Sequence, residues 1–353
     1  MQKLPRPLLQ ILIGDEEVAA LFSNEAEVSA LLETEAALAK AQAEAGLIGM
    51  DAAGRIAEIC RAFRPDWSAL AEGLAQDGVI VPALVKQLRA AIGEPHAKAL
   101  HLGATSQDII DTALILRLKS IIEILGSRIA ELASALRSLR ARDGAVKLMA
   151  HTRMQRALPF TAADKIDTWL QPLERHAQGL EELSPRLLVV QLGGPIGTRG
   201  EMKDRGDAVA DAMAEFLGLG YGPSWHSQRD RIGEFAAFLS LLSGTLGKIG
   251  QDVALMAQNE IGEVRLASGG GSSAMPHKSN PVQAELLVTL ARYNAGLLGT
   301  LHQALVHENE RSGAAWTLEW IVLPQMVEAA AAGLSKALAL IASMSFSPER
   351  SEH

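Results

Sequence analysis

Residues 107–140, QDIIDTALILRLKSIIEILGSRIAELASALRSLR, carry the most regular pattern in this chain of 353 residues. Apolar side chains recur there at spacings of three and four, the period of a helix with one buried face; they are Ile110, Leu114, Leu118, Ile121, Leu125, Ile129, Leu132, Leu136 and Leu139. Such a helix is roughly 50 Å long at 1.5 Å per residue. Helices this long are typical of bundles, and we expect this stripe to face another subunit.

The rest of the chain favours the same architecture. Further helical windows cover residues 25–48, 161–183, 227–266 and 282–306, and no segment alternates convincingly between polar and apolar residues. Ala and Leu are abundant while aromatics make up 4% of the chain, a mix that favours helices packed on helices. We therefore predict an all-α long-helix bundle without substantial sheet, divided into an N-terminal helical domain (1–105) and a central long-helix domain (106–353).

Composition restricts the partners and the compartment. The net charge of -8 argues against a general affinity for nucleic acid or anionic membranes. An anionic small molecule fits, because a binding site needs only a local positive field. Cys60 is the single cysteine, so no intrachain disulfide can form. Without a signal-peptide pattern at the N-terminus or a run approaching ~20 apolar residues, we expect a soluble cytoplasmic protein with neither nucleic-acid nor membrane partners.

The most unusual stretch is Gly269–Pro281, GGGSSAMPHKSNP, which cannot continue a helix. Its composition fits an ordinary exposed connector and a functional loop equally well. A phosphate-binding P-loop is excluded because His277, and not glycine, precedes Lys278. A serine-hydrolase elbow is excluded because no G-x-S-x-G surrounds the serines. The chain also lacks H-E-x-x-H, so the sequence gives no support for a metal site.

Three segments resemble the fumarase/aspartase superfamily. Gly271–Asn280, GSSAMPHKSN, matches the signature G-S-S-x-M-P-x-K-x-N at every fixed position. His101–Asp108, HLGATSQD, is similar to the first conserved segment of that superfamily, and Ala150–Pro159, AHTRMQRALP, is similar to the second. The resemblance runs from about residue 20 to 325, and the segments 225–231 and 307–320 look most like the carboxymuconate cycloisomerase branch.

This resemblance implies an assembly and a set of ligands. Superfamily members are homotetramers around a core of long helices, and each active site takes its three regions from three subunits. Thr105 and Ser106 would hold a substrate carboxylate near His101. Read without the family, Thr105 followed by Asp108 is a capping-box-like helix start, which leaves a purely structural interpretation open. The C-terminal helical domain of the superfamily is expected to be missing or reduced here, and no metal or organic cofactor is implied.

The second segment departs from the superfamily pattern. Many members have G-R-T-H-x-Q, in which the histidine protonates the leaving group. Here Arg153 stands in the place of that histidine and His151 in the place of the arginine. Arginine cannot act as a general acid at neutral pH, whereas a carboxylate leaving group, with a pKa near ~4, needs no proton. The departure therefore favours cycloisomerisation, in which 3-carboxy-cis,cis-muconate or a close anionic analogue closes to a lactone. Arg153 would then bind a carboxylate of this di- or tricarboxylate through its positive charge.

The resemblance assigns the remaining roles. Ser272 is expected to exchange the proton at C2 of the substrate, and Lys278 to stabilise its alkoxide and the developing negative charge. The expected carboxylate-binding residues are His101, Thr105, Ser106, His151, Arg153, Gln155, Ser273 and Asn280. His277 occupies a variable position of the signature and also fits a solvated loop residue.

Two alternative functions stay open. The first is another lyase of the superfamily, acting on an adenylosuccinate-like substrate or an amino acid, which Arg153 disfavours. The second is a non-catalytic structural member, which the intact signature with Ser272 and Lys278 disfavours. The sequence does not distinguish a carboxylate from a sulfonate at C3 of the substrate, nor does it fix the stereochemistry of addition.

Overall fold

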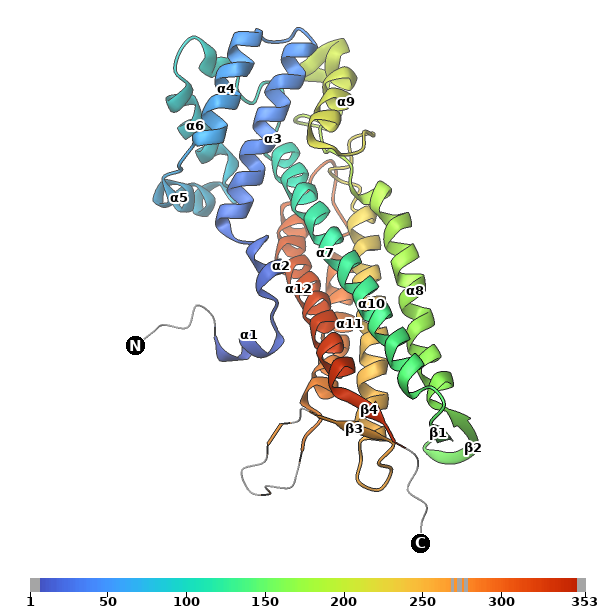
Figure 1. Ribbon diagram of the computed structural model, residues 1–353. Coiled ribbons are helices and arrows are strands. Elements are labelled where there is room, and N and C mark those ends of the chain that lie inside the picture. Colours follow the sequence, from blue (N-terminus) through green and yellow to red (C-terminus); the bar gives the residue numbers. More distant parts are fainter. Residues whose placement is uncertain (1–6, 268–269, 272–274, 276–278, 348–353) are drawn as a thin grey trace.

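The protein is described by a computed structural model that covers residues 7–267, 270–271, 275 and 279–347. This part of the chain contains twelve α-helices, two short 3₁₀ helices and two sheets of two strands each (Figure 1). The prediction of an all-α fold is confirmed.

Five long helices form an elongated bundle, in which α7 and α8 lie side by side and α10 packs against both α11 and α12 (Figure 1). Their bounds are Ser106–Asp143 for α7, Ala162–Leu187 for α8, Asp230–Met256 for α10, Val282–Gln303 for α11 and Gly313–Ser343 for α12. The window expected to be helical up to residue 266 ends ten residues earlier, because the chain turns after Met256 and then forms a strand.

The apolar stripe of α7 is buried inside its own chain. All nine stripe residues are between 0 and 6% exposed. Eight of them belong to one hydrophobic core together with residues of α8, α10 and α12. The expectation that the stripe faces another subunit is therefore wrong. Helical periodicity reports that a face is buried, and here the neighbouring helices of the same chain bury it.

A second hydrophobic core lies at one end of the bundle and joins the N-terminal helices to a later segment. It contains α3 (Asn24–Glu44), α4 (Met50–Ala62), α5 (Trp67–Asp77) and α6 (Val81–Ile92), followed by a 3₁₀ turn at His96–Ala99. The 3₁₀ segment Gly200–Arg205 and α9 (Gly206–Leu217) return to this end, where α9 packs on α3 (Figure 1). The domain division at residue 105 stays a prediction.

The N-terminal arm, made of α1 (Leu8–Ile13) and α2 (Glu16–Ala20), lies along the bundle. Asp15 caps α2 by accepting the Val18 N–H at 3.1 Å, and the guanidinium of Arg128 in α7 binds both of its carboxylate oxygens. Burial alone would raise the pKa of Asp15, but Arg128 and the Val18 N–H hold that pKa below its usual value. The arm is thus fastened to the middle of the bundle by an ionised carboxylate.

The opposite end of the bundle carries both small sheets. β1 (Lys147–Thr152) and β2 (Gln155–Thr161) form an antiparallel hairpin directly after α7, with a register shift between Met149 and His151. β3 (Val264–Leu266) pairs antiparallel with β4 (Met344–Phe346). The Met149 N–H donates to Oε1 of buried Glu263 at 2.8 Å, which ties the hairpin to the segment before β3.

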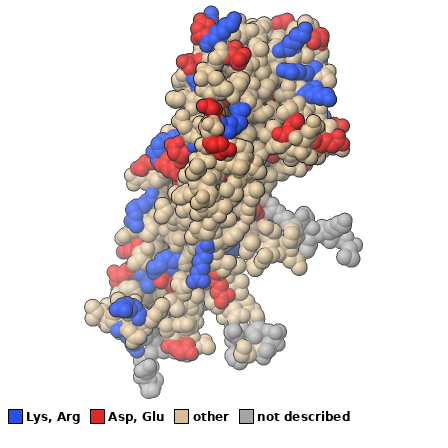
Figure 2. Space-filling view, turned by 180° about the vertical axis from the view of Figure 1, so that it is seen from behind, with Lys and Arg blue, Asp and Glu red and all other residues tan. Residues whose placement is uncertain are grey.

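Two bundle helices, α10 and α12, are long and apolar enough to cross a membrane by length and composition. In each of them 61% of the most apolar window is buried inside the chain, so both are core helices of the bundle. Their outer faces are still apolar in places, as at Leu241 and Ile321, which are 66 and 57% exposed. Figure 2 shows few charged side chains along the middle of the face that it presents.

Candidate active site

The first predicted region surrounds the N-terminus of α7. Thr105 is the N-cap, and its N–H donates to Oδ2 of Asp108 at 3.0 Å, as the spacing of these residues predicts. Thr105, Ser106 and His101 are partly buried. A helix N-terminus presents free N–H groups and the positive end of the helix dipole, so two accessible hydroxyls at this place suit a carboxylate ligand.

Asp108 joins this helix start to the Gly-rich segment 191–198. Its Oδ1 accepts the Gly193 N–H at 2.7 Å and the amide of Gln191 at 3.0 Å, and its Oδ2 accepts the Gly194 N–H at 2.9 Å. Burial raises the pKa of Asp108 to about 6, although these donors and the Thr105 N–H favour the charged carboxylate. Both carboxylate oxygens of Asp108 therefore accept hydrogen bonds from within the protein, which gives this residue a structural role.

His101 is held by a side chain of α3. Its Nδ1 lies 2.6 Å from Oε1 of Glu35, a residue of α3 that is 1% exposed. Burial by itself would lower the pKa of His101, but the charge of Glu35 and its hydrogen bond outweigh that effect, and the pKa is raised above 6.5. The ring is thereby kept cationic to a higher pH than a free histidine, which favours an anionic ligand.

The second predicted region lies on the β1–β2 hairpin. His151 belongs to β1 and Gln155 to β2, and Arg153 and Met154 form the two-residue turn between them. Both turn residues have left-handed backbones, with φ of 50° and 66°. Turns of this kind favour Asn-Gly, and each non-glycine residue with a left-handed backbone costs about 1–3 kcal/mol. His151, Arg153 and Gln155 are all exposed.

The third predicted region is the signature loop. Gly270 and Asn280 pair through two backbone hydrogen bonds of 2.9 Å, so the loop leaves and returns at one place beside β3. A Cβ on Gly270 would lie 2.5 Å from Cγ2 of Val282, which explains why glycine is needed there. Ser272, Ser273, His277 and Lys278 lie outside the described residues.

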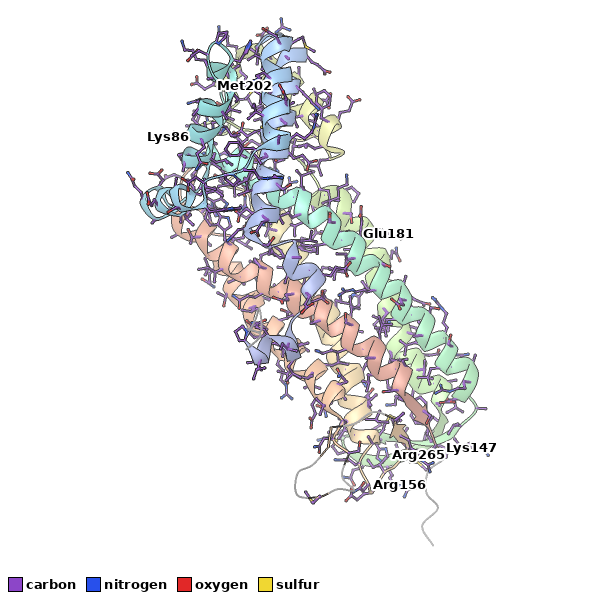
Figure 3. The ribbon with its side chains drawn as sticks, turned by 60° about the vertical axis from the view of Figure 1, so that its left-hand side comes forward. Lys86, Lys147, Arg156, Glu181, Met202 and Arg265 are labelled. Carbon is purple, nitrogen blue, oxygen red and sulfur yellow. The ribbon has the colours of Figure 1, made fainter. Side chains whose placement is uncertain are left out.

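One chain does not bring the three regions together. The first region is at the start of α7, and the hairpin follows the other end of this helix. The helix has 38 residues, so its two ends are roughly 57 Å apart along the axis. The hairpin and the base of the signature loop share the far end of the bundle (Figure 1). Figure 3 shows that end with Lys147 of β1, Arg156 of β2 and Arg265 of β3, three basic residues on neighbouring elements.

The described residues near the start of α7 include an ion-pair cluster that our sequence reasoning missed. Arg229 is fully buried, with its Nη1 2.6 Å from Oδ2 of Asp111 and its Nε 2.9 Å from Oε2 of Glu319. The indole of Trp316 donates to the other Asp111 oxygen at 3.0 Å. Burial raises the pKa of Glu319 despite its pairing with Arg229.

Sequence patterns gave only a weak signal for these residues. Asp111 and Glu319 interrupt apolar stretches of α7 and α12, and a charge within such a stretch often marks a buried pair. Which residues pair depends on contacts between segments about 90 to 200 positions apart, and periodicity carries no such information. Among the described residues, no group of three or more His, Cys, Asp and Glu side chains could hold a metal ion.

Comparison with known proteins assigns the family. The profile of a family described as lyase matches residues 13–295. The chain belongs to this lyase family. The match confirms the resemblance to the fumarase/aspartase superfamily that the three sequence segments indicated.

Individual relatives of this lyase refine the picture. The 3-carboxy-cis,cis-muconate cycloisomerase of Pseudomonas aeruginosa is 41% identical over 338 residues, which are 94% of this chain and 74% of the relative. The crystal structure of the 3-carboxy-cis,cis-muconate lactonizing enzyme from Pseudomonas putida aligns with a TM-score of 0.91 at 38% identity, covering 97% of this chain and 78% of that one. Trans-aconitate decarboxylase 1 of Mycosarcoma maydis is 32% identical over 98% of this chain and 71% of the relative.

Proposed function

We propose that the protein is a cycloisomerase that closes 3-carboxy-cis,cis-muconate, or a close anionic analogue, to a muconolactone. Its relatives at 37 to 41% identity with that activity in their names support this substrate class. The observation on this chain that carries the proposal is Arg153, which occupies a strained turn where other superfamily lyases have an acid histidine.

The reaction is an intramolecular addition. An oxygen of the distal carboxylate bonds to C3 and closes a five-membered ring, and the electron pair of the C2–C3 double bond moves onto the C1 carboxylate. A proton then goes to C2, so the trianion and one proton, replaced on the donor from solvent, give a lactone with two carboxylates. Ser272 would deliver this proton, and Lys278 and Asn280 would stabilise the negative charge on the C1 carboxylate.

Binding a tricarboxylate requires positive charge and hydrogen-bond donors. Thr105, Ser106 and His101 would supply them at the start of α7, where the helix dipole adds to the field. His151, Arg153 and Gln155 would supply them on the hairpin, near the basic side chains of Lys147, Arg156 and Arg265 (Figure 3). Ser273 would contribute from the signature loop. None of these side chains needs a cofactor for its role.

The left-handed backbone of Arg153 supports a functional role for this residue. A turn with two non-glycine residues in this conformation is disfavoured, and such strain concentrates at functional sites. Arg153 is also exposed at the hairpin tip. Its guanidinium is therefore accessible to a carboxylate, either of a bound ligand or of another copy of the chain.

We also propose that the active site is completed by other copies of the chain in a homotetramer. The start of α7 and the hairpin lie at opposite ends of the bundle, so residues of both regions meet only if copies pack side by side. Exposed apolar residues on the bundle helices, such as Leu241, Tyr293 and Ile321, fit contacts between copies. A cytoplasmic enzyme of aromatic-acid degradation is the setting that fits this substrate.

The proposal is tested by incubating the purified protein with 3-carboxy-cis,cis-muconate. Loss of the ultraviolet absorbance of the conjugated diene, with a lactone in the product by NMR, is the expected result. The 3-sulfonate analogue, trans-aconitate and adenylosuccinate serve as competing substrates. Release of carbon dioxide from trans-aconitate, or of fumarate from adenylosuccinate, without lactone formation from the muconate would show that the protein has another activity of the family and is not a cycloisomerase. Inactivity towards all of them would favour a structural role.

A further inference from the structure

The N-terminal helices meet α7 and α12 at one end of the bundle (Figure 1), and a pocket of about 280 Å³ that is open to solvent lies between them. Its walls are mostly apolar, with Leu74 from α5, Ile110 and Leu114 from α7 and Leu323 from α12. Of the predicted site residues that the structure describes, none lines this pocket. The proposed reaction therefore does not account for it.

Arg117 places a positive charge in this apolar pocket. It follows Leu114 by three positions in α7, so both side chains lie on the face of the helix that lines the pocket. Its Nε donates to the carbonyl of Ala113 at 3.3 Å, and its guanidinium carbon lies 5.7 Å from the ring centre of Phe22. Both Nη groups are accessible, and neither has a hydrogen bond or an ion pair with a described residue. Arg117 therefore keeps two donor groups for a ligand.

Two carboxylates also line the pocket, and neither of them neutralises Arg117. Glu319 uses both of its oxygens for Arg229, with Oε2 2.9 Å from Nε and Oε1 2.5 Å from Nη2. Burial lowers the pKa of Arg117, and the charge of Glu27 offsets this effect only in part, since no ion pair joins these two described residues. A partly buried charge without a close counter-charge is costly, so the pocket favours an anionic ligand.

The volume and the walls of the pocket restrict the rest of this ligand. A cavity of about 150 Å³ with apolar walls is large enough for benzene, so about 280 Å³ accommodates an aromatic ring with one short polar group. Arg117 is the one cation that lines the pocket in the described part of the chain, which disfavours a ligand with several negative charges. A guanidinium binds a carboxylate well, because two parallel N–H groups match its two oxygens.

We propose that this pocket binds a small aromatic monocarboxylate, with the carboxylate on the guanidinium of Arg117 and the ring between the apolar side chains of α7 and α12. The two Nη groups donate to the two carboxylate oxygens. The ligand lies outside the candidate active site, and its binding does not depend on cycloisomerisation. Because it binds the folded chain only, it also raises the melting temperature.

The test uses benzoate as the probe and benzamide, which has the same shape without the charge, as its control. Calorimetry should show saturable binding of benzoate by the wild type and weaker binding of benzamide. Arg117→Met should raise the Kd of benzoate roughly tenfold or more, because a hydrogen bond between charged groups is lost. Glu27→Gln should lower this Kd roughly twofold to fivefold, because a like charge near the carboxylate is removed. Arg137→Met, the same substitution at an exposed position of α7, is the matched control and should leave Kd unchanged.

Circular dichroism and sedimentation check the fold and the oligomeric state of each variant. Absence of saturable benzoate binding, equal Kd values for Arg117→Met and Arg137→Met, or displacement of benzoate by propane-1,2,3-tricarboxylate would overturn the site. A changed oligomeric state in Arg117→Met would show that the pocket is a contact between copies of the chain and would overturn it as well. If Arg117→Met does not fold, Glu27→Gln decides, since an unchanged or weaker affinity in that variant contradicts a carboxylate on Arg117. None of these measurements uses turnover, so the proposed reaction is tested separately.

Discussion

Nδ1 of His101 lies 2.6 Å from Oε1 of Glu35, so α3 directly holds a residue of the candidate site. His101 reaches this contact from a backbone with a φ of 62°, an uncommon conformation for a residue other than glycine. Glu35 comes from the middle of α3, where a carboxylate is 1% exposed among apolar neighbours. The pair makes the orientation and charge of His101 depend on the packing of α3 against α7.

The first prediction concerns the pH dependence of this pair. Because the pKa of His101 is raised in the folded protein, the pair stabilises the fold fully below pH 6.5, and this contribution is lost as pH rises through the folded pKa. Glu35→Gln should lower the His101 pKa measured by NMR titration. It should also reduce the free energy of unfolding more at pH 6 than at pH 9. An equal loss at both pH values would show that Glu35 acts through packing and not through charge.

The second prediction concerns the buried ion-pair cluster of Arg229, Asp111 and Glu319. Arg229→Met should lower the free energy of unfolding by about 3–5 kcal/mol, because two buried carboxylates lose their counter-charge. Urea denaturation of the variant and the wild type measures the difference. Arg186→Met is the control, since Arg186 pairs with Glu234 at the surface and its loss should change the midpoint little. Similar midpoints for the two variants would contradict the assigned importance of the buried cluster.

Local sequence patterns predicted α3, α7, α8, α10 and α11 and the start of α7, but α12 (Gly313–Ser343) was not among the predicted windows. The stripe from Ile110 to Leu139 lies within α7, and Thr105 with Asp108 forms the capping box that their spacing suggested. Both features depend on residues within a few positions of each other. The partner of the stripe was predicted wrongly, because periodicity is the same whether a face meets another helix of the chain or another subunit.

The β1–β2 hairpin and the contacts between distant segments were not predicted. The hairpin around Arg153 has little period-two alternation, and its turn residues are not the usual Asn-Gly, so no local rule indicated it. The buried pairing of Arg229 with Asp111 and Glu319 joins residues 118 and 90 positions apart. The sequence resemblance named candidate residues, whereas their placement at two ends of one bundle required the structure.

The third prediction concerns the proton-transfer group. Ser272→Ala should lower kcat about 10²- to 10⁴-fold while leaving substrate binding largely intact, because the substrate would lose the donor at C2 but keep its carboxylate contacts. Steady-state kinetics and calorimetry with a non-reacting tricarboxylate measure the two effects separately. Ser279→Ala, seven positions further along the same loop and at a variable position of the signature, is the matched control. Near-normal kcat for Ser272→Ala would mean that another residue moves the proton.

The last prediction concerns Arg153 at the tip of the hairpin. If its guanidinium clamps a substrate carboxylate, Arg153→Met should mainly raise KM, because the contact exists in the ground state and the transition state alike. A hydrogen bond between charged groups contributes about 1.5–3 kcal/mol, so kcat/KM should fall roughly ten- to a hundredfold. Arg153→His should not improve lactonisation, since a carboxylate nucleophile needs no acid to assist it. Arg153→Gly relaxes the turn without supplying a charge, and it should be as poor as the methionine variant. Wild-type kinetics in all three variants would show that Arg153 does not bind the substrate. The absence of an acid histidine at this position would then no longer support lactonisation.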